Sequence, residues 1–260
     1  MFSIEGKKAF VSGASRGLGR QFANALAKAG ADVAITSRTL SSLEGTREEL
    51  EAEGSKCVPL EMNVLNLESI QTAAKKAELE LGKIDILINN SGCNIRKPAL
   101  EVSWDDWDTV VNTNLKGAFF LAQAIGKGMT ERNYGRIVNI GSVTCVAGYA
   151  GLTPYGASRG GIKQMTMSLA HDWGKNGVTV NCLAPGWFKT EQNAKLFEDE
   201  DWVNYIEEKI PLGRIGKPND LDGTCLFLAS DASAYVTGQT ILVDGGISVG
   251  AVRAMPANNN

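Results

Sequence analysis

Short runs of β-branched and other apolar residues alternate along the chain with longer segments whose apolar residues recur at helical spacing. Seven of the short runs are typical of strands, at residues 7–13, 31–37, 57–62, 84–90, 135–142, 177–185 and 239–246. Helical segments separate most of these runs, which predicts βαβ units and a parallel sheet with helices on both faces. We therefore predict an α/β fold with a doubly wound parallel sheet of about seven strands.

The predicted elements form a single domain over residues 1–250. A chain of 260 residues, 43% of them hydrophobic, is long enough to bury one large core, and no low-complexity linker divides it. Residues 187–211 hold five aromatic side chains and follow the sixth strand, where ligands bind in such sheets, so this segment is a predicted substrate lid. The last residues, MPANNN, offer little to pack, and residues 251–260 are predicted to be a flexible tail.

Composition excludes several kinds of partner. The 26 Lys and Arg against 29 Asp and Glu give a net charge of -3, which argues against nucleic acid. Five scattered cysteines and one histidine, His171, form no metal-ligand pattern, so we expect reduced thiols, a structural His171 and no metal. The N-terminus leads straight into a strand and no run approaches the ~20 apolar residues of a membrane span, so we expect a cytoplasmic protein without a membrane partner.

A glycine-rich loop follows the first predicted strand and opens a helix. Gly13, Gly17 and Gly19 stand in the stretch SGASRGLGRQF, where glycines let the backbone turn sharply and approach a pyrophosphate at the helix N-terminus. A tight turn without a ligand is the simpler interpretation of such a cluster, but the position after the first strand favours a Rossmann-type dinucleotide site.

The end of the second predicted strand indicates which dinucleotide binds. NAD sites usually carry an acidic residue there for the ribose 2′-hydroxyl, whereas this chain has Ser37 and Arg38. A guanidinium suits a 2′-phosphate, and Arg16 in the glycine loop can approach from the other side. Both arginines predict NADP(H), the alternative being two solvated surface charges.

Motifs along the chain resemble those of the short-chain dehydrogenase/reductase family, from Lys7 to Gly246. They are SGASRGLG, NNSG at 89–92, Asn114 in NTNLKG, Ser142 in NIGSV, Tyr155 in PYGASR, Pro185-Gly186 and TGQTILVDGG. The resemblance implies catalytic roles for Asn114, Ser142, Tyr155 and the residue four positions after the tyrosine. Together with the loops above, it implies a cofactor site made of Gly13, Ser15, Arg16, Gly17, Leu18, Gly19, Ser37, Arg38, Asn63, Val64, Asn90, Gly92, Tyr155, Arg159, Pro185, Gly186 and Thr190.

The chemistry of hydride transfer explains a tyrosine-centred site. A proton must join or leave the substrate oxygen while hydride joins or leaves its carbon, so an acid/base and a second donor are needed. A cation 4 to 5 Å from a phenolate stabilises it by roughly 3 to 4 kcal/mol at an effective dielectric of 20.

Two positions depart from the family pattern. The usual lysine after the tyrosine is Arg159, which reaches the same helix face as Tyr155 but is bulkier and always protonated, so we expect slowed catalysis. Lys163 lies too far along the helix to replace it. Asn63 stands where an aspartate usually flanks the adenine, and keeps an acceptor oxygen.

Within the family, the stretch APGWFKTEQNAKLFEDEDW and LTPYGAS are similar to the gluconate 5-dehydrogenases and related sugar-acid dehydrogenases. We therefore expect an NADP-dependent alcohol dehydrogenase or ketoreductase acting on a small molecule such as a sugar acid or polyol. Arg96 and Lys97 are candidates to face a substrate carboxylate, or else form an exposed charged turn. The GYAG segment at 148–151 lacks the charges of those enzymes, which leaves a less polar ketone open.

Two other functions fit the same motifs. One is the reduction of 3-oxoacyl thioesters or general ketones, against which the acidic cluster at 198–201 argues mildly. The other is a dinucleotide-binding sensor or structural subunit whose catalysis has lapsed through Arg159. The resemblance also implies a homotetramer assembled through helices at 107–129 and 155–173, although burial in the core explains the same apolar faces.

Overall fold

A computed structural model describes residues 2–191 and 193–250 of the chain. These residues contain one sheet of parallel strands in the order β3-β2-β1-β4-β5-β6-β7. The strands are β1 (Lys8–Val11), β2 (Asp32–Ser37), β3 (Cys57–Glu61), β4 (Ile86–Asn89), β5 (Gly135–Ile140), β6 (Val178–Pro185) and β7 (Thr240–Val243). The predicted seven-stranded α/β fold is confirmed. The predicted tail at 251–260 lies outside the described residues.

The sheet is buried on both faces at its centre. Every residue of β4, β5 and β6 is buried, as expected for strands that read as continuous apolar runs. Because β1 pairs with β2 on one side and with β4 on the other, the sheet reverses its winding direction between β1 and β4. Ligands of doubly wound sheets bind at the carboxyl ends of the strands beside such a reversal.

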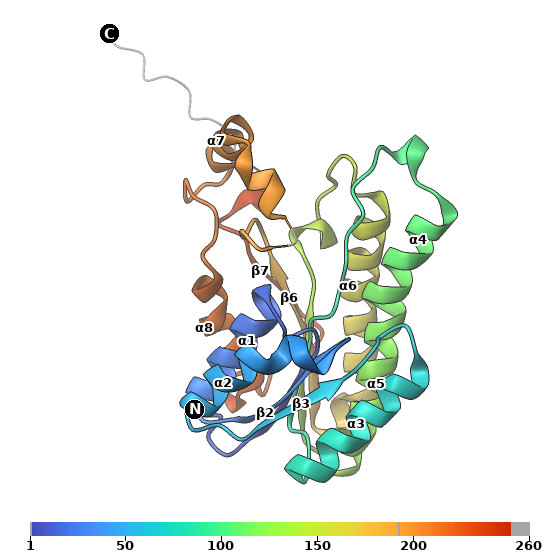
Figure 1. Ribbon diagram of the computed structural model, residues 1–260, viewed down its shortest axis with the longest axis vertical. Coiled ribbons are helices and arrows are strands. Elements are labelled where there is room, and N and C mark those ends of the chain that lie inside the picture. The colour runs from blue at the N-terminus through green and yellow to red at the C-terminus, as the bar shows by residue number, and fades with distance from the viewer. Residues whose placement is uncertain (1, 192, 251–260) are drawn as a thin grey trace.

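Helices cover both faces of the sheet. They are α1 (Gly17–Lys28), α2 (Glu44–Ala52), α3 (Leu67–Leu81), α4 (Trp104–Val111), α5 (Gly117–Glu131), α6 (Thr153–Trp173), α7 (Glu200–Lys209) and α8 (Asp222–Ala229). Figure 1 shows α1, α2 and α8 on one face and α3, α4, α5 and α6 on the other. Two apolar clusters match these layers, one containing Phe22 and Leu228, the other Leu121 and Leu169. No helix among the described residues is sufficiently long and apolar to cross a membrane.

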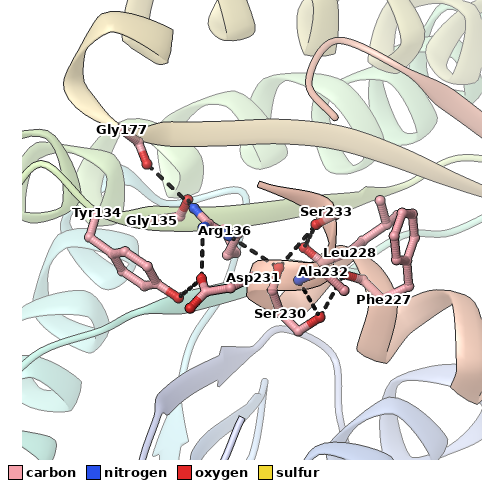
Figure 2. A network of polar contacts seen from close by, with 10 residues as sticks. All are labelled: Tyr134, Gly135, Arg136, Gly177, Phe227, Leu228, Ser230, Asp231, Ala232 and Ser233. Atoms are coloured by element: carbon pink, nitrogen blue, oxygen red, sulfur yellow. Dashed lines mark hydrogen bonds and ion pairs between the residues drawn. The ribbon is translucent and has the colours of Figure 1, made fainter. Parts of the chain in front are cut away.

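A polar network closes the amino-terminal end of the sheet (Figure 2). The buried Arg136 of β5 donates to the Asp231 carboxylate at 2.8 Å and to the Ser230 carbonyl at 3.4 Å. The hydroxyl of Tyr134 donates to the same carboxylate at 3.0 Å. These bonds fix the segment after α8 to the start of β5, at the end of the sheet opposite the loops described next.

The predicted lid, residues 187–211, contains a short 3₁₀ turn at Ala194–Glu198 and helix α7. Its aromatic side chains pack edge to face on one another. The ring centroids of Trp187 and Trp202 are 5.0 Å apart, and those of Phe197 and Trp202 are 5.4 Å apart. Trp187 also packs against Tyr149, from the loop before α6, at 5.6 Å. These aromatic residues therefore pack the segment together and hold it against that loop.

Candidate active site

The loops after β1, β4, β5 and β6 open at the carboxyl end of the sheet. They carry the glycine loop, the Asn90 to Gly92 segment, Ser142, and the Pro185-Gly186 pair. Helix α6 packs against β6 and the turn after β5, and its first turns bring Tyr155 and Arg159 to the same end. The fold thus gathers segments that are more than 100 residues apart in sequence.

The glycine loop has the geometry of a phosphate cradle. Gly13 and Gly17 adopt left-handed φ values of +66° and +55°, which disfavour residues with a Cβ. A Cβ on Gly19 would stand 2.1 Å from the Gly13 carbonyl oxygen, so a side chain there would force the loop away from α1. Ser15 and Leu18 belong to the same turn, and the first turn of α1 carries no acidic residue. The free N–H groups and helix dipole therefore suit an anion.

Asn90 braces this loop from the next strand. Its side-chain amide donates to the carbonyls of Ser12 and Gly13, at 3.0 and 3.1 Å. The Ser12 hydroxyl in turn accepts from the backbone N–H groups of Asn90 and Ser91, both at 2.9 Å. The predicted role of Asn90 at the cofactor is therefore, in this structure, to fix the shape of the loop.

Arg16 and Arg38 lie at neighbouring loop ends, since the Ala14 N–H donates to the Thr36 carbonyl at 2.9 Å. Arg38 is exposed, and no ion-pair partner for it exists within the described residues. Arg16 stands at the N-cap position of α1 without a side-chain capping bond, and its guanidinium lies 3.5 Å from the Glu191 carboxylate, with both side chains more than half exposed. An exposed pair contributes at most about 1 kcal/mol, so both guanidinium groups are available to a phosphate.

The adenine side of the predicted site follows β2 and β3. Ser37 ends β2, and its hydroxyl bonds within its own loop. The Asn63 side-chain oxygen accepts from the Leu65 N–H at 3.0 Å, so the acceptor expected to meet adenine is already used in a turn. Val64 lies close to the start of α5, because a Cβ on Gly117 would stand 2.6 Å from the Val64 carbonyl oxygen.

Asn114 lies in a π-helical segment, Asn112–Lys116, between α4 and α5. Such segments are frequent at functional sites. The buried side-chain oxygen of Asn114 accepts from the Cys93 N–H at 2.7 Å. Its amide donates to the Cys93 carbonyl at 2.9 Å and to the Ser158 hydroxyl at 3.1 Å. The side chain therefore ties the loop after β4 to α6.

Ser142 follows the end of β5, and Tyr155 lies in the first turn of α6, the helix that packs against the turn after Ser142. Ser142 is nearly buried, and its hydroxyl oxygen accepts from the Thr144 N–H at 3.2 Å, which closes a short turn. The hydroxyl proton of Ser142 is thereby left to donate elsewhere. Tyr155 is half-buried, and the Arg159 guanidinium carbon lies 4.9 Å from its ring centroid.

Arg159 is 6% exposed and is held by main-chain groups. One terminal nitrogen donates to the Ile140 carbonyl at 2.9 Å. The other lies 2.5 Å from where a Cβ on Gly92 would stand, so glycine at 92 makes room for the guanidinium. The Nε atom is buried and has no partner within the described residues. The predicted contact with Tyr155 is present, and the Nε is left as an orphan donor.

The segment after β6 runs from Pro185 and Gly186 toward the glycine loop. A Cβ on Gly186 would stand 2.6 Å from the Asp244 Cα, so the chain after β6 passes close to the chain after β7. Thr190 packs within 3.8 Å of the position of a Cβ on Gly17. The structure therefore brings the predicted residues of the sixth loop against those of the first.

Arg96 and Lys97, which follow Gly92, make different contacts. Lys97 forms an ion pair with Asp106 at 2.6 Å and lowers the pKa of that carboxyl to about 2. Arg96 is exposed and packs its stem near Gly151. Arg96 thus remains a candidate for an anionic substrate, while Lys97 supports the cap of α4. His171 is exposed in the last turn of α6, roughly 24 Å along the helix from Tyr155.

A buried amide chain beneath the site was missed by the sequence analysis. The Asn89 amide donates to the Ala118 carbonyl at 2.7 Å and to the Asn139 side-chain oxygen at 3.1 Å. The Asn139 amide donates to the Thr166 hydroxyl at 3.0 Å. Polar residues inside continuous apolar strand runs were the available signal, because buried polar groups need partners.

The residues present fit a bound dinucleotide. The close approach of Gly19 to Gly13 forms the cradle, and within the described residues the exposed Arg38 meets no acidic side chain and the Arg159 Nε lacks a partner. A buried donor without a partner is costly, so the Nε is the feature that most needs a bound group.

Comparison with known proteins gives consistent matches over the whole chain. A family model described as Enoyl-(Acyl carrier protein) reductase matches residues 13–248. The chain is similar to gluconate 5-dehydrogenase of Gluconobacter oxydans, with 41% identity over 96% of this chain and 97% of that protein. It is also similar to 2-dehydro-3-deoxy-D-gluconate 5-dehydrogenase of Escherichia coli, with 41% identity over 94% of this chain and 96% of that protein.

A solved structure also matches nearly the whole chain. Gluconate 5-dehydrogenase from Burkholderia cenocepacia, in complex with NADP and tartrate, superposes with a TM-score of 0.93 and 35% identity. The match covers 96% of this chain and 98% of that one.

Proposed function

Since the chain belongs to the short-chain dehydrogenase/reductase family, we propose that it is an NADP(H)-dependent oxidoreductase that interconverts a secondary alcohol of a sugar acid and the matching ketone. The observation that carries the proposal is the stack of Arg159 on Tyr155, in the helix that packs against the turn after Ser142, at the end of the sheet where the glycine loop opens. That arrangement joins an acid/base, a second donor and a fixed positive charge.

The roles of the residues follow from their positions. Tyr155 delivers a proton to the substrate oxygen during reduction and removes it during oxidation. Ser142 donates a hydrogen bond to the same oxygen, since its own acceptor function is used by Thr144. Arg159 places a positive charge over the Tyr155 ring, near the reacting oxygen, and Asn114 positions the loop that carries Gly92. NADPH supplies the hydride when it is bound.

The preference for NADP(H) rests on charge. Arg38 and Arg16 flank the end of β2 without a strong acidic partner, which suits a 2′-phosphate. Three similar gluconate or deoxygluconate dehydrogenase structures carry NADP. The glycine loop would hold the pyrophosphate at the start of α1.

A sugar acid is the substrate class that we propose. The similar proteins named above act on gluconate or a deoxygluconate, and the exposed Arg96 is a candidate to meet a carboxylate. A 3-oxoacyl-[acyl-carrier-protein] reductase of Vibrio harveyi is 37% identical over 94% of this chain, so thioesters belong in the assay as competitors.

We further propose that residues 187–211 close over the substrate and that the protein is a cytoplasmic homotetramer. The ring contact between Trp187 and Tyr149 is a place where such a lid can part from the loop before α6. Half-buried Phe119 and Phe120 on α5 and exposed Met167 on α6 support an interface on these helices. Light scattering would measure the assembly.

The direct test is a binding and turnover assay with the purified chain. NADPH and NADH binding is followed by fluorescence, and oxidation of the reduced cofactor is then measured with keto-sugar acids, simple ketones and 3-oxoacyl thioesters. We expect tighter binding of NADPH and fastest turnover with a keto-sugar acid. Binding without turnover of any ketone would refute the enzymatic proposal, and faster turnover of thioesters would refute the substrate class.

A further inference from the structure

Two cysteines that are 37 positions apart in sequence meet beside the active site. Cys145 lies in the short turn after Ser142, and Cys182 lies in β6. Their sulfur atoms stand 2.9 and 2.5 Å from the point where a Cβ on Gly141 would begin. Glycine at 141 therefore leaves the space in which both sulfurs sit, and the two thiols are neighbours in that space.

The two thiols differ in reactivity. Cys145 is partly exposed, and its interaction with the Cys182 thiol, together with the positive charges of Arg159 and Lys163, lowers its pKa to about 7. Cys182 is fully buried, and the same interaction and burial raise its pKa. Burial raises the pKa of Cys57 and Cys225 to about 12. Cys145 is thus the more acidic thiol of the two, with a second thiol beside it.

We propose that Cys145 and Cys182 form a redox-active dithiol that a small peroxide oxidises to a disulfide. The Cys145 thiolate attacks one peroxide oxygen, the O–O bond breaks, and a sulfenic acid forms as hydroxide takes a proton and leaves as water. The Cys182 thiol then attacks the sulfenic sulfur, the S–O bond breaks, and a second water leaves. The two thiols lose two electrons, which the peroxide gains.

The disulfide would change the catalytic turn. The Cys145 thiol donates to the Arg159 carbonyl at 3.1 Å, and the Cys145 N–H donates to the Ser142 carbonyl at 2.8 Å. Drawing the Cys145 sulfur into a bond with Cys182 removes the first contact and pulls on the second, because a disulfide demands a sulfur separation near 2.05 Å. Oxidation should therefore lower turnover, and reduction should restore it.

The test treats the full-length protein with hydrogen peroxide, blocks the remaining thiols, and maps cross-linked peptides by mass spectrometry. We expect a Cys145 to Cys182 cross-link, at least tenfold loss of turnover with the best substrate found, and recovery in dithiothreitol. Fully alkylated Cys145 after peroxide treatment, with no cross-link, would overturn the proposal. The peptide map does not depend on turnover, so it decides even if the proposed activity fails.

Three variants sharpen the result. Cys145→Ser and Cys182→Ala should each abolish the cross-link and protect turnover from reversible loss, and Cys182→Ala should leave a Cys145 sulfenic acid that dimedone traps. Cys57 lies at the start of the edge strand β3, away from this pair, so Cys57→Ser should behave as the unmodified protein in the reduced and in the oxidised state. Equal peroxide sensitivity in Cys145→Ser would show that inactivation arises elsewhere and would contradict the proposed coupling to the active site.

Discussion

Replacing Arg159 with methionine tests the electrostatic account of the site. The guanidinium carbon is 4.9 Å from the Tyr155 ring centroid, in a position that is only 6% exposed. At an effective dielectric near 20, one positive charge about 5 Å from a negative charge that develops during the reaction stabilises it by roughly 3 kcal/mol. Since each 1.36 kcal/mol is a factor of ten, Arg159→Met should slow alcohol oxidation at neutral pH by roughly 100- to 300-fold.

The assay is the rate of alcohol oxidation at saturating NADP⁺. Arg159→Lys keeps the charge and frees the contact with Gly92, and we expect it to be faster than the unmodified enzyme. A loss below about fivefold in Arg159→Met would refute the electrostatic reasoning. A lysine variant no faster than the parent would refute the claim that arginine slows catalysis.

The folding stability of the variants needs a separate control, because Arg159 also donates a hydrogen bond to the Ile140 carbonyl. Losing that charged donor costs about 1 to 3 kcal/mol. Thermal unfolding and NADPH fluorescence of both variants should therefore be recorded. Methionine should lower the melting temperature by several degrees, and the rate comparison should be made well below it.

Three further results are expected. Arg38→Asp should weaken NADPH binding by roughly 10- to 100-fold while NADH binding is not weakened, and equal effects on both would contradict a 2′-phosphate contact. Gly19→Ala should reduce NADPH affinity at least tenfold and lower the melting temperature, because its Cβ would stand 2.1 Å from the Gly13 carbonyl oxygen; normal binding by fluorescence would disprove this. Alkylation of Cys145 by iodoacetamide should rise through pH 7, with thiolate forming above its pKa of about 7, whereas Cys225, with a pKa of about 12, should stay unmodified until unfolding.

The central strands β4, β5 and β6 were predictable because burial on both faces leaves a continuous apolar run. The sixth run, residues 177–185, differs from β6 by one residue. The helix expected at 107–129 was less accurate. Its start is at Trp104, capped by Ser103, whose hydroxyl accepts from the Asp106 N–H at 3.1 Å. The spacing of Ser103 and Asp106 is a capping-box signal that was available in the sequence.

The π-helical interruption of that helix was not predictable from apolar spacing. A single wider turn leaves the pattern on either side nearly in phase, so α4 and α5 read as one helix. The contacts of Asn114 with Cys93 and Ser158 join positions 21 and 44 residues away. Only the folded chain brings such partners together. The sequence motif therefore singled out Asn114 but did not predict its hydrogen-bond partners.

The orientation of Arg159 also depended on the fold. Helical spacing placed it beside Tyr155, but its bond to Ile140 and its fit against Gly92 arise from the ends of β5 and β4. The sequence likewise showed Cys145 and Cys182 as separate thiols, because strand pairing and the turn after β5 alone bring them together.

The hydrogen bonds of Asn114 join the loop after β4 to helix α6, so the two segments should move together. A displacement of the loop after β4 at Cys93 is transmitted through the amide to Ser158, one helical turn from Tyr155. We therefore expect a substitution at 114 to displace both the loop after β4, beside the proposed cofactor site, and the start of α6, which carries the proposed proton donor Tyr155. Rate losses in such variants measure the alignment of two reactants, and the energy of a single hydrogen bond should not be read from them.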